Sequence, residues 1–111
     1  MQITELRQGD VMVLAVSGRL DTEATKPFEL SVLQHLDEGE DKLVLDMGGV
    51  DYINSSCLRV VLTAAKRLHG SQGRLALCAL RDTLREVFDI SGFSRILEIH
   101  PSRAQALAAM H

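Results

Sequence analysis

The sequence contains no tryptophan, and aromatic residues make up only 4% of its 111 residues. Side chains that could stack on nucleic-acid bases are therefore scarce. Lysine and arginine, 12 in all, are outnumbered by 15 aspartates and glutamates, which gives a net charge of −3 at pH 7. Because binding to a phosphate backbone depends on clustered cations, we expect no nucleic-acid partner.

Long hydrophobic runs are also absent. The longest unbroken apolar segment, Val11–Val16, is far shorter than the ~20 residues that a membrane-spanning helix needs. The N-terminal residues show neither the basic patch nor the apolar stretch of a secretory signal. We therefore expect no membrane insertion.

Cysteines are few. Cys57 and Cys78 are not patterned as a disulfide framework, which favours a reducing cytoplasm as the location of the protein. Cys78 lies within an apolar segment and is expected to be a small core residue. Neither the cysteines nor the histidines have the spacing of metal ligands, so we expect no metal site and no cofactor. Each histidine is expected at the surface: His35, His69, His100 and His111.

The apolar residues that are present fit a single domain over residues 1–111, since 46% of the chain is hydrophobic and its length allows a core without metal or disulfide staples. Two apolar segments, Ile3–Arg7 and Val11–Ser17, are separated by Gly9 and Asp10. A turn signal between two such segments predicts an antiparallel hairpin.

Helices and strands alternate in the rest of the chain. Apolar residues at helical spacing predict four helices, of which the third is capped by Asp82 and the fourth by a capping box of Ser102 and Gln105. Short apolar segments predict the remaining strands, with a loop at 48–54 after the first of them: Leu43–Met47, Leu75–Ala79 and Ile96–Ile99. The order β-β-α-β-α-β-α-β-α predicts an α/β fold, in which about four helices cover a mixed, largely parallel sheet that begins with an antiparallel strand pair.

The most unusual segment, from Asp51 to Arg59, places two hydroxyls and a thiol in the first turn of the second helix. Backbone N–H groups are unpaired there, and the helix dipole favours negative charge. Asn54 or Ser55 is expected to cap this helix. Capping explains one polar residue but leaves Ser56 and Cys57 without a structural role.

An enzyme that uses Cys57 is a possible interpretation, because a thiol at a helix N-terminus can have a lowered pKa. A phosphatase-type loop, however, needs an arginine at the sixth position after the cysteine, where this chain has Thr63, and a glycine cradle between the two. A serine hydrolase needs a histidine base and glycines around its nucleophile, whereas Ser56 is flanked by Ser55 and Cys57. We therefore expect no enzymatic activity.

A second polar segment, Gly18-Arg19-Leu20-Asp21, joins the second strand to the first helix. Ligand and partner chemistry on sheets of this kind collects at the loops where strands end and helices begin. Asp21 can be part of such a site, or it can simply lie in a turn near the helix start.

Together these segments resemble the STAS family, which is shared by sulfate transporters and bacterial anti-sigma factor antagonists. Gly18–Asp21 resembles the family's Gly-x-Leu-Asp turn, and Leu43–Asp46 its central strand. Asn54–Leu58 resembles the Asp-Ser-Ser-Gly-Leu phosphorylation motif, and Val87–Phe93 the segment before the last strand. The similarity extends over nearly the whole chain.

The resemblance implies a phosphorylatable module that is a substrate and not a catalyst. In the antagonists, an anti-sigma factor that is a serine kinase with a histidine-kinase-like ATP site phosphorylates the second serine of the motif, which corresponds to Ser56, with Ser55 as the second choice. The unmodified antagonist binds the kinase and frees the sigma factor, and a serine phosphatase resets it. The free protein is expected to be a monomer.

The resemblance also implies which side chains contact the kinase: Asp21, Asn54, Ser55, Cys57 and Arg59. Asp21 is expected to be solvated and to matter little for folding. Two positions depart from the family motif, because Asn54 replaces an aspartate and Cys57 a glycine. The alternative is a docking subunit of a membrane transporter, or of another regulatory complex, that works without phosphorylation.

Overall fold

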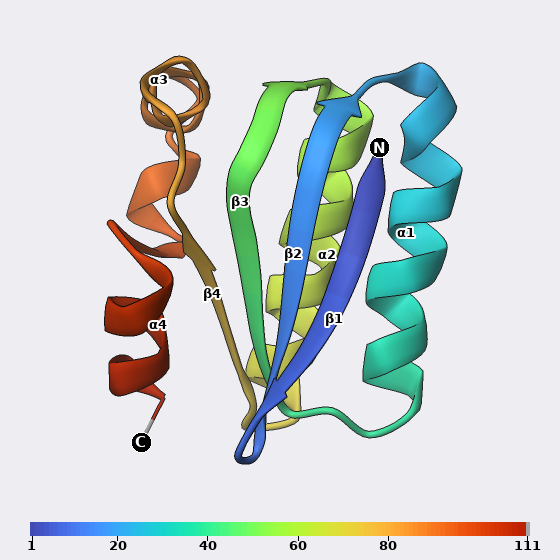
Figure 1. Ribbon diagram of the computed structural model, residues 1–111, viewed down its shortest axis with the longest axis vertical. Helices are drawn as coiled ribbons and strands as arrows, with labels where there is room; N and C mark the ends of the chain where they lie inside the picture. Colours follow the sequence, from blue (N-terminus) through green and yellow to red (C-terminus); the bar gives the residue numbers. More distant parts are fainter. Residues whose placement is uncertain (111) are drawn as a thin grey trace.

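Helices lie on both faces of a five-stranded sheet in the computed structural model, which describes residues 1–110 (Figure 1). The chain order of these elements is the predicted one, with one additional short 3-10 helix, η1. Their bounds are β1 (Gln2–Gln8), β2 (Val11–Leu20), α1 (Thr22–Asp37), β3 (Lys42–Ile53), α2 (Ser55–Gly70), β4 (Arg74–Cys78), α3 (Asp82–Ile90), η1 (Phe93–Arg95), β5 (Glu98–His100) and α4 (Arg103–Ala109).

The strand order in the sheet is the same as the order along the chain, β1-β2-β3-β4-β5. β1 and β2 pair antiparallel, and the three pairs that follow are parallel. Both features confirm the α/β fold expected from the sequence. The parallel strands bring their carboxyl ends to one edge of the sheet, where each leads toward the next helix (Figure 1).

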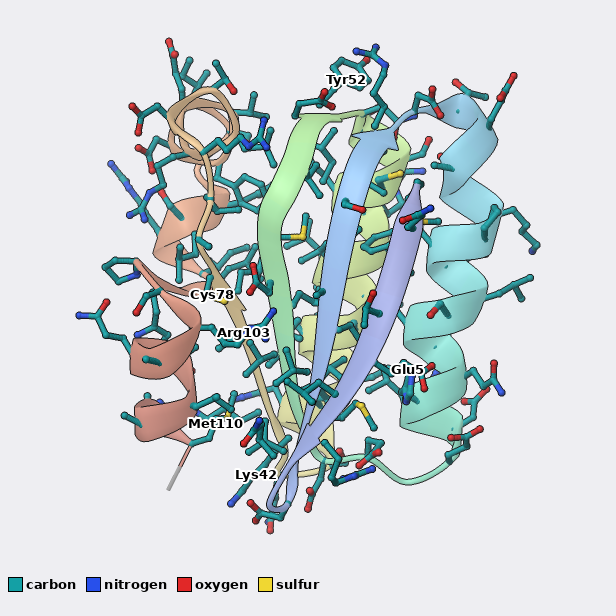
Figure 2. The ribbon with its side chains drawn as sticks, viewed as in Figure 1. Glu5, Lys42, Tyr52, Cys78, Arg103 and Met110 are labelled. Atoms are coloured by element: carbon teal, nitrogen blue, oxygen red, sulfur yellow. The ribbon has the colours of Figure 1, made fainter. Side chains whose placement is uncertain are left out.

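The core has two layers because successive side chains of a strand point to opposite faces of the sheet. Leu14 belongs to the larger cluster, which includes Phe28 of α1 and Val61 of α2. Val13 belongs to the smaller cluster, which includes Met110 after the end of α4 (Figure 2). The unbroken apolar run in β2 is thus explained by burial on both faces.

β2 and β3 are longer than the sequence predicts, and the expected loop at 48–54 is largely strand. β2 continues to Leu20 and β3 to Ile53, with two register shifts in their pairing. Glycine is needed at these irregularities. Gly18 has a φ of +96°, and a Cβ at Gly49 would lie only 2.6 Å from the Cβ of Ser17, so the chains approach closely where a bulge bends the sheet.

Two further local predictions are wrong. Asp82 is the first residue of α3 and not its cap; Arg81 is the cap residue, with no side-chain hydrogen bond. The carboxylate of Asp82 still lies in the first turn, where the helix dipole favours it. The last strand begins at Glu98, because Phe93–Arg95 form η1.

His35 is buried rather than exposed. It lies on the inner face of α1, and its Nε2 is 3.0 Å from Oε1 of Glu5 in β1. The imidazole therefore links the first strand to the first helix. His69 is exposed as expected, His100 is half-buried beside Glu98, and His111 lies outside the described residues.

The fourth helix begins as predicted. The hydroxyl of Ser102 accepts a hydrogen bond from the backbone N–H of Gln105 at 3.2 Å. The Gln105 side chain contacts the Ser102 hydroxyl instead of completing a capping box through the backbone. Cys78 is fully buried in the smaller core cluster, as expected.

Candidate functional site

The candidate site lies at the carboxyl ends of β2 and β3, where the chain enters α1 and α2 (Figure 1). The backbone N–H of Asn54 donates to the carbonyl of Leu20 at 2.9 Å. This hydrogen bond joins the two strand ends just before each helix begins. The two segments singled out in the sequence, which are more than thirty positions apart, are therefore brought together by the fold.

Both helices are capped by the polar residue that follows the strand. Oδ1 of Asn54 accepts from the N–H of Cys57 at 2.9 Å, which confirms the predicted cap of α2. Oδ1 of Asp21 accepts from the N–H of Ala24 at 3.1 Å. Asp21 is therefore half-buried rather than fully solvated, and because its carboxylate satisfies a backbone donor of α1, the structure predicts a contribution to stability that the sequence did not suggest.

Cys57 is fully buried between the first turns of α1 and α2. Its Sγ lies 3.3 Å from the hydroxyl of Thr25, and that hydroxyl donates to the carbonyl of Asp21 at 2.9 Å. Either the thiol or the Thr25 hydroxyl can donate in this contact, and Sγ also lies 4.0 Å from the carbonyl oxygen of Asp21 as a donor. Cys57 thus has a structural role that the sequence analysis did not assign.

The chemistry of Cys57 follows from this burial. Burial raises the pKa of the thiol above its ordinary value of 9.0; the Thr25 contact lowers it and the charge of Asp21 raises it, both by less. The thiol is therefore protonated at neutral pH and is a poor nucleophile. The same burial conflicts with the expectation that the Cys57 side chain contacts a partner.

Ser55, Ser56 and Arg59 are exposed on the first turns of α2. Residues three apart on a helix are neighbours on its surface, so the side chains of Ser56 and Arg59 lie on one side of the helix. The hydroxyl of Ser56 can be reached from solvent while Asn54 and Cys57 hold the turn beneath it.

Tyr52 and Arg19 extend this surface across the strand ends. The guanidinium carbon of Arg19 lies 4.4 Å from the centroid of the Tyr52 ring, a cation–π contact. Tyr52 is 41% exposed at the edge of the sheet (Figure 2). No pattern in the sequence indicates this pair, because the two residues face each other only when β2 and β3 continue to Leu20 and Ile53.

The described part of the chain contains no group of three or more His, Cys, Asp or Glu side chains arranged to hold a metal ion. Over the same residues, no helix combines the length and apolar character required to cross a membrane.

Comparisons with known proteins point to one family. A profile of the STAS domain matches residues 2–106. A Bordetella bronchiseptica protein named as an anti-sigma factor antagonist, BtrV, is 39% identical over 109 residues, which cover 98% of this chain and 94% of that protein.

Two solved structures share the fold. The crystal structure of a Thermotoga maritima protein described as an anti-sigma factor antagonist is similar with a TM-score of 0.93 at 24% identity, covering 97% of this chain and 93% of that one. The Bacillus cell fate determinant SpoIIAA in its phosphorylated form is similar with a TM-score of 0.76 at 19% identity, covering 99% and 100%.

Proposed function

Since this chain belongs to the STAS domain family, we propose that it is an anti-sigma factor antagonist that changes partners when Ser56 is phosphorylated. The 39% identity to a protein of that name, over almost the full length of both chains, supports this function. The match of Asn54–Leu58 to the family's phosphorylation motif supports Ser56 as the acceptor.

The observation that carries the proposal is the contrast between Ser56 and its neighbours. Asn54 caps α2 and Cys57 is buried beneath the turn, whereas Ser56 is exposed. A kinase can therefore reach the hydroxyl without unfolding the helix. Its target also sits on a turn that two hydrogen bonds, Asn54 to Leu20 and Cys57 to Asn54, hold in place.

In the proposed cycle, the unmodified protein binds an anti-sigma factor serine kinase through the surface around Ser56. Ser55 and Arg59 are exposed beside the acceptor on α2, and Tyr52 is exposed at the end of β3, the strand that leads into this helix. The kinase transfers the γ-phosphoryl group of ATP to the Ser56 hydroxyl oxygen: a new O–P bond forms, the bond to ADP breaks, and the hydroxyl proton passes to a base of the kinase. A serine phosphatase then hydrolyses the phosphoserine and resets the cycle.

The charge of the phosphate on Ser56 is what changes the binding of the partner. A phosphate adds about −1.5 to −2 charges and three strong acceptor oxygens. In a closely packed interface this charge is desolvated without compensation unless the partner places a cation opposite, so the complex dissociates. Within the domain, the phosphate lies in the first turn of α2, where the helix dipole favours it. Phosphorylation at Ser56 is therefore expected to change binding and to leave the fold intact.

Two departures from the family motif are compatible with this cycle. Asn54 keeps the cap that an aspartate would form but adds no negative charge beside the acceptor. Cys57 replaces a glycine at a helical position, where the freedom of glycine is not required. The proposed partners imply a cytoplasmic protein, and the two free, buried cysteines agree with a reducing compartment.

The test is to incubate the purified protein with ATP and the serine kinase encoded nearest to it, and to measure intact mass and fragment masses. We expect one added phosphate in the wild type and in Ser55→Ala, and none in Ser56→Ala. A phosphate that moves to Ser55 in Ser56→Ala would overturn the acceptor. A kinase that binds the protein tightly but never modifies it would instead favour a docking subunit that works without phosphorylation.

A further inference from the structure

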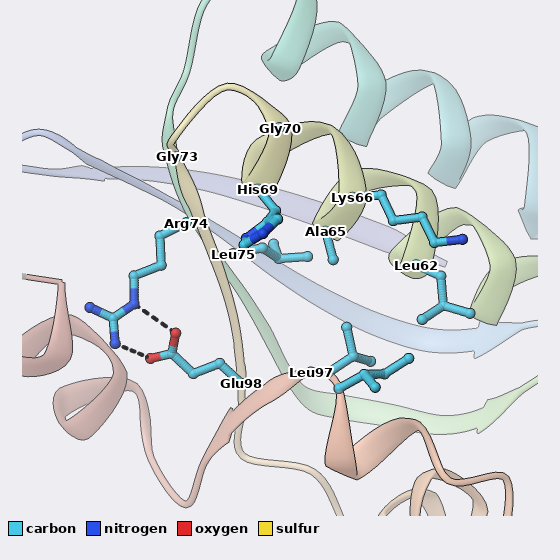
Figure 3. Close-up of a pocket in the computed structure, with 11 residues that line it drawn as sticks. Leu62, Ala65, Lys66, His69, Gly70, Gly73, Arg74, Leu75, Leu97 and Glu98 are labelled. Atoms are coloured by element: carbon cyan, nitrogen blue, oxygen red, sulfur yellow. Dashed lines mark hydrogen bonds and ion pairs between the residues drawn. The ribbon is translucent and has the colours of Figure 1, made fainter.

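A cavity of about 590 Å³ opens between the C-terminal half of α2 and the segment that leads from η1 into β5 (Figure 3). Its size lies within the range of about 300–1,000 Å³ that is typical of small-ligand sites. α2 spans Ser55–Gly70, and the lining residues of this helix begin at Leu62. At a rise of about 1.5 Å per residue, the cavity begins about 9 Å along the helix axis from Ser56 and follows the C-terminal half of α2.

The walls of the cavity are aliphatic. Leu62 and Ala65 line it from α2, Leu75 from β4, and Ile96 and Leu97 from the segment before β5. Figure 3 shows Leu62 and Leu97 on opposite sides of the cavity. Ile96 is 67% exposed, so a large apolar side chain at the wall stays in contact with water. Covering this surface is favourable, by about 25 cal/mol for each Å² of apolar area removed from water.

The polar side chains of α2 that line the cavity are one cation and one imidazole. Lys66 and His69 line it there, and both are exposed. Among the lining residues that the structure describes, Glu98 is the single carboxylate. Its oxygens are bound by Arg74 at 2.7 and 2.9 Å (Figure 3), so its charge is already compensated. The cavity therefore presents the uncompensated charge of Lys66 next to an aliphatic wall.

The chemistry of the lining selects a class of ligand. None of the described lining side chains carries a hydroxyl or an amide, so the site lacks the groups that usually read the hydroxyls of a sugar or the edge of a base. An aliphatic chain complements the walls, and an anionic head group complements the ammonium of Lys66 and a ring N–H of His69. We propose that this cavity binds an aliphatic carboxylate, with its chain against Leu62, Ile96 and Leu97 and its head group at Lys66 and His69.

The proposal is tested by calorimetric titration of the wild-type protein with decanoate below its micelle concentration, and by mapping amide shifts in NMR spectra. We expect saturable binding, with shifts at α2 residues 62–70 and at 96–98. Octanoate, which is two methylenes shorter, should bind about tenfold more weakly. Decyl maltoside, with the same chain and a neutral head, should also bind more weakly than decanoate.

Three variants assign the site. Ile96→Glu places a carboxylate at the wall and should abolish binding, while the exposure of this residue allows the fold to be kept, as a thermal unfolding curve will check. Lys66→Gln should weaken binding about fivefold, which corresponds to about 1 kcal/mol. Lys26→Gln removes an exposed lysine on α1 and is the matched control, with unchanged affinity.

Several results would contradict the proposed carboxylate site. Decanoate binding that does not saturate, or that is the same in folded Ile96→Glu, would overturn the site. Equal affinity for decanoate and decyl maltoside would contradict the role of Lys66 and His69 in holding the head group. Binding to phosphatidylglycerol vesicles without binding to free decanoate would identify a lipid surface instead and reject a free carboxylate. None of these results depends on whether Ser56 is phosphorylated.

Discussion

The thiol of Cys57 lies 3.3 Å from the hydroxyl of Thr25 and thereby ties the first turn of α2 to the first turn of α1. Thr25 in turn donates to the carbonyl of Asp21, the residue that caps α1. The first turns of the two helices thus form one connected unit beneath the exposed hydroxyl of Ser56. The cysteine that stands in place of the family's glycine is a packing residue of this unit.

Replacing Cys57 should therefore lower the stability of the domain and leave the phosphorylation of Ser56 unchanged. Cys57→Ala leaves a small cavity and is expected to lower the free energy of unfolding by about 1 kcal/mol. Cys57→Gly restores the family residue but adds the helix cost of glycine, for a total of about 2 kcal/mol. Urea unfolding of both variants measures these changes. Unchanged stability in Cys57→Gly would contradict the packing role of Cys57. Loss of Ser56 phosphorylation in folded Cys57→Ala would show that the thiol also has a chemical role.

Asp21 should contribute to stability through its cap. Asp21→Ala leaves the N–H of Ala24 without its partner, and we expect a loss of about 1 kcal/mol in the free energy of unfolding. Asp21→Asn keeps an acceptor oxygen and should lose much less, which makes it the matched control. Kinase binding can then be compared in the stable Asn variant. If it binds as wild type does, the charge of Asp21 is not used in recognition.

Ser56→Asp separates folding from binding. A carboxylate in the first turn of α2 interacts favourably with the helix dipole by about 0.3–1 kcal/mol, so the melting temperature should hold or rise slightly. Kinase binding should be lost, because the same charge is desolvated in the proposed interface. Ser56→Asn has the same shape without the charge and should keep most of the affinity. Calorimetry with the kinase measures the difference, and a folded Ser56→Asp that binds as tightly as the wild type would place the interface elsewhere.

Stability should fall in alkaline solution because of Cys78. Burial raises the pKa of this thiol from 9.0 to about 11, and the negative charge of Asp46 adds to the shift. The unfolded chain thus releases the proton near its ordinary pKa, while the folded chain keeps it. The stabilisation is present in full below that pKa and is lost as the pH rises toward about 11, by an amount on the order of 2 kcal/mol.

The control for this effect is Cys78→Ala, measured by urea unfolding at several pH values between neutral and about 10.5. It should be less stable than the wild type at neutral pH because of the cavity, but its stability should decline less steeply with pH. Parallel declines in the two proteins would show that other groups cause the alkaline loss.

The architecture was predictable from the sequence because its signals are local. The hairpin turn at Gly9 and Asp10 and the alternation of strands and helices were sufficient to predict the mixed sheet. The extension of β3 was not predictable, since Gly48 and Gly49 are equally typical of a loop and of a bulged strand. Only the close approach of Gly49 to Ser17 in the folded chain distinguishes the two.

The candidate site was predictable in part. The cap at Asn54 follows from residue type and position, and the structure confirms it. The burial of Cys57 does have a signal in the sequence. Val61, Ala64 and Leu68 follow it at helical spacing, and all three are buried. The contact of His35 with Glu5 had no local signal, since it joins segments 30 positions apart.

The strand order β1-β2-β3-β4-β5 has a consequence for how the protein is made. Each new strand pairs with the one synthesised just before it, and each parallel pairing spans the helical segment between its two strands. On the ribosome, the β1–β2 hairpin is complete first, and each later strand can join an edge that already exists. The sheet therefore grows in one direction, and no strand has to be inserted between two earlier ones.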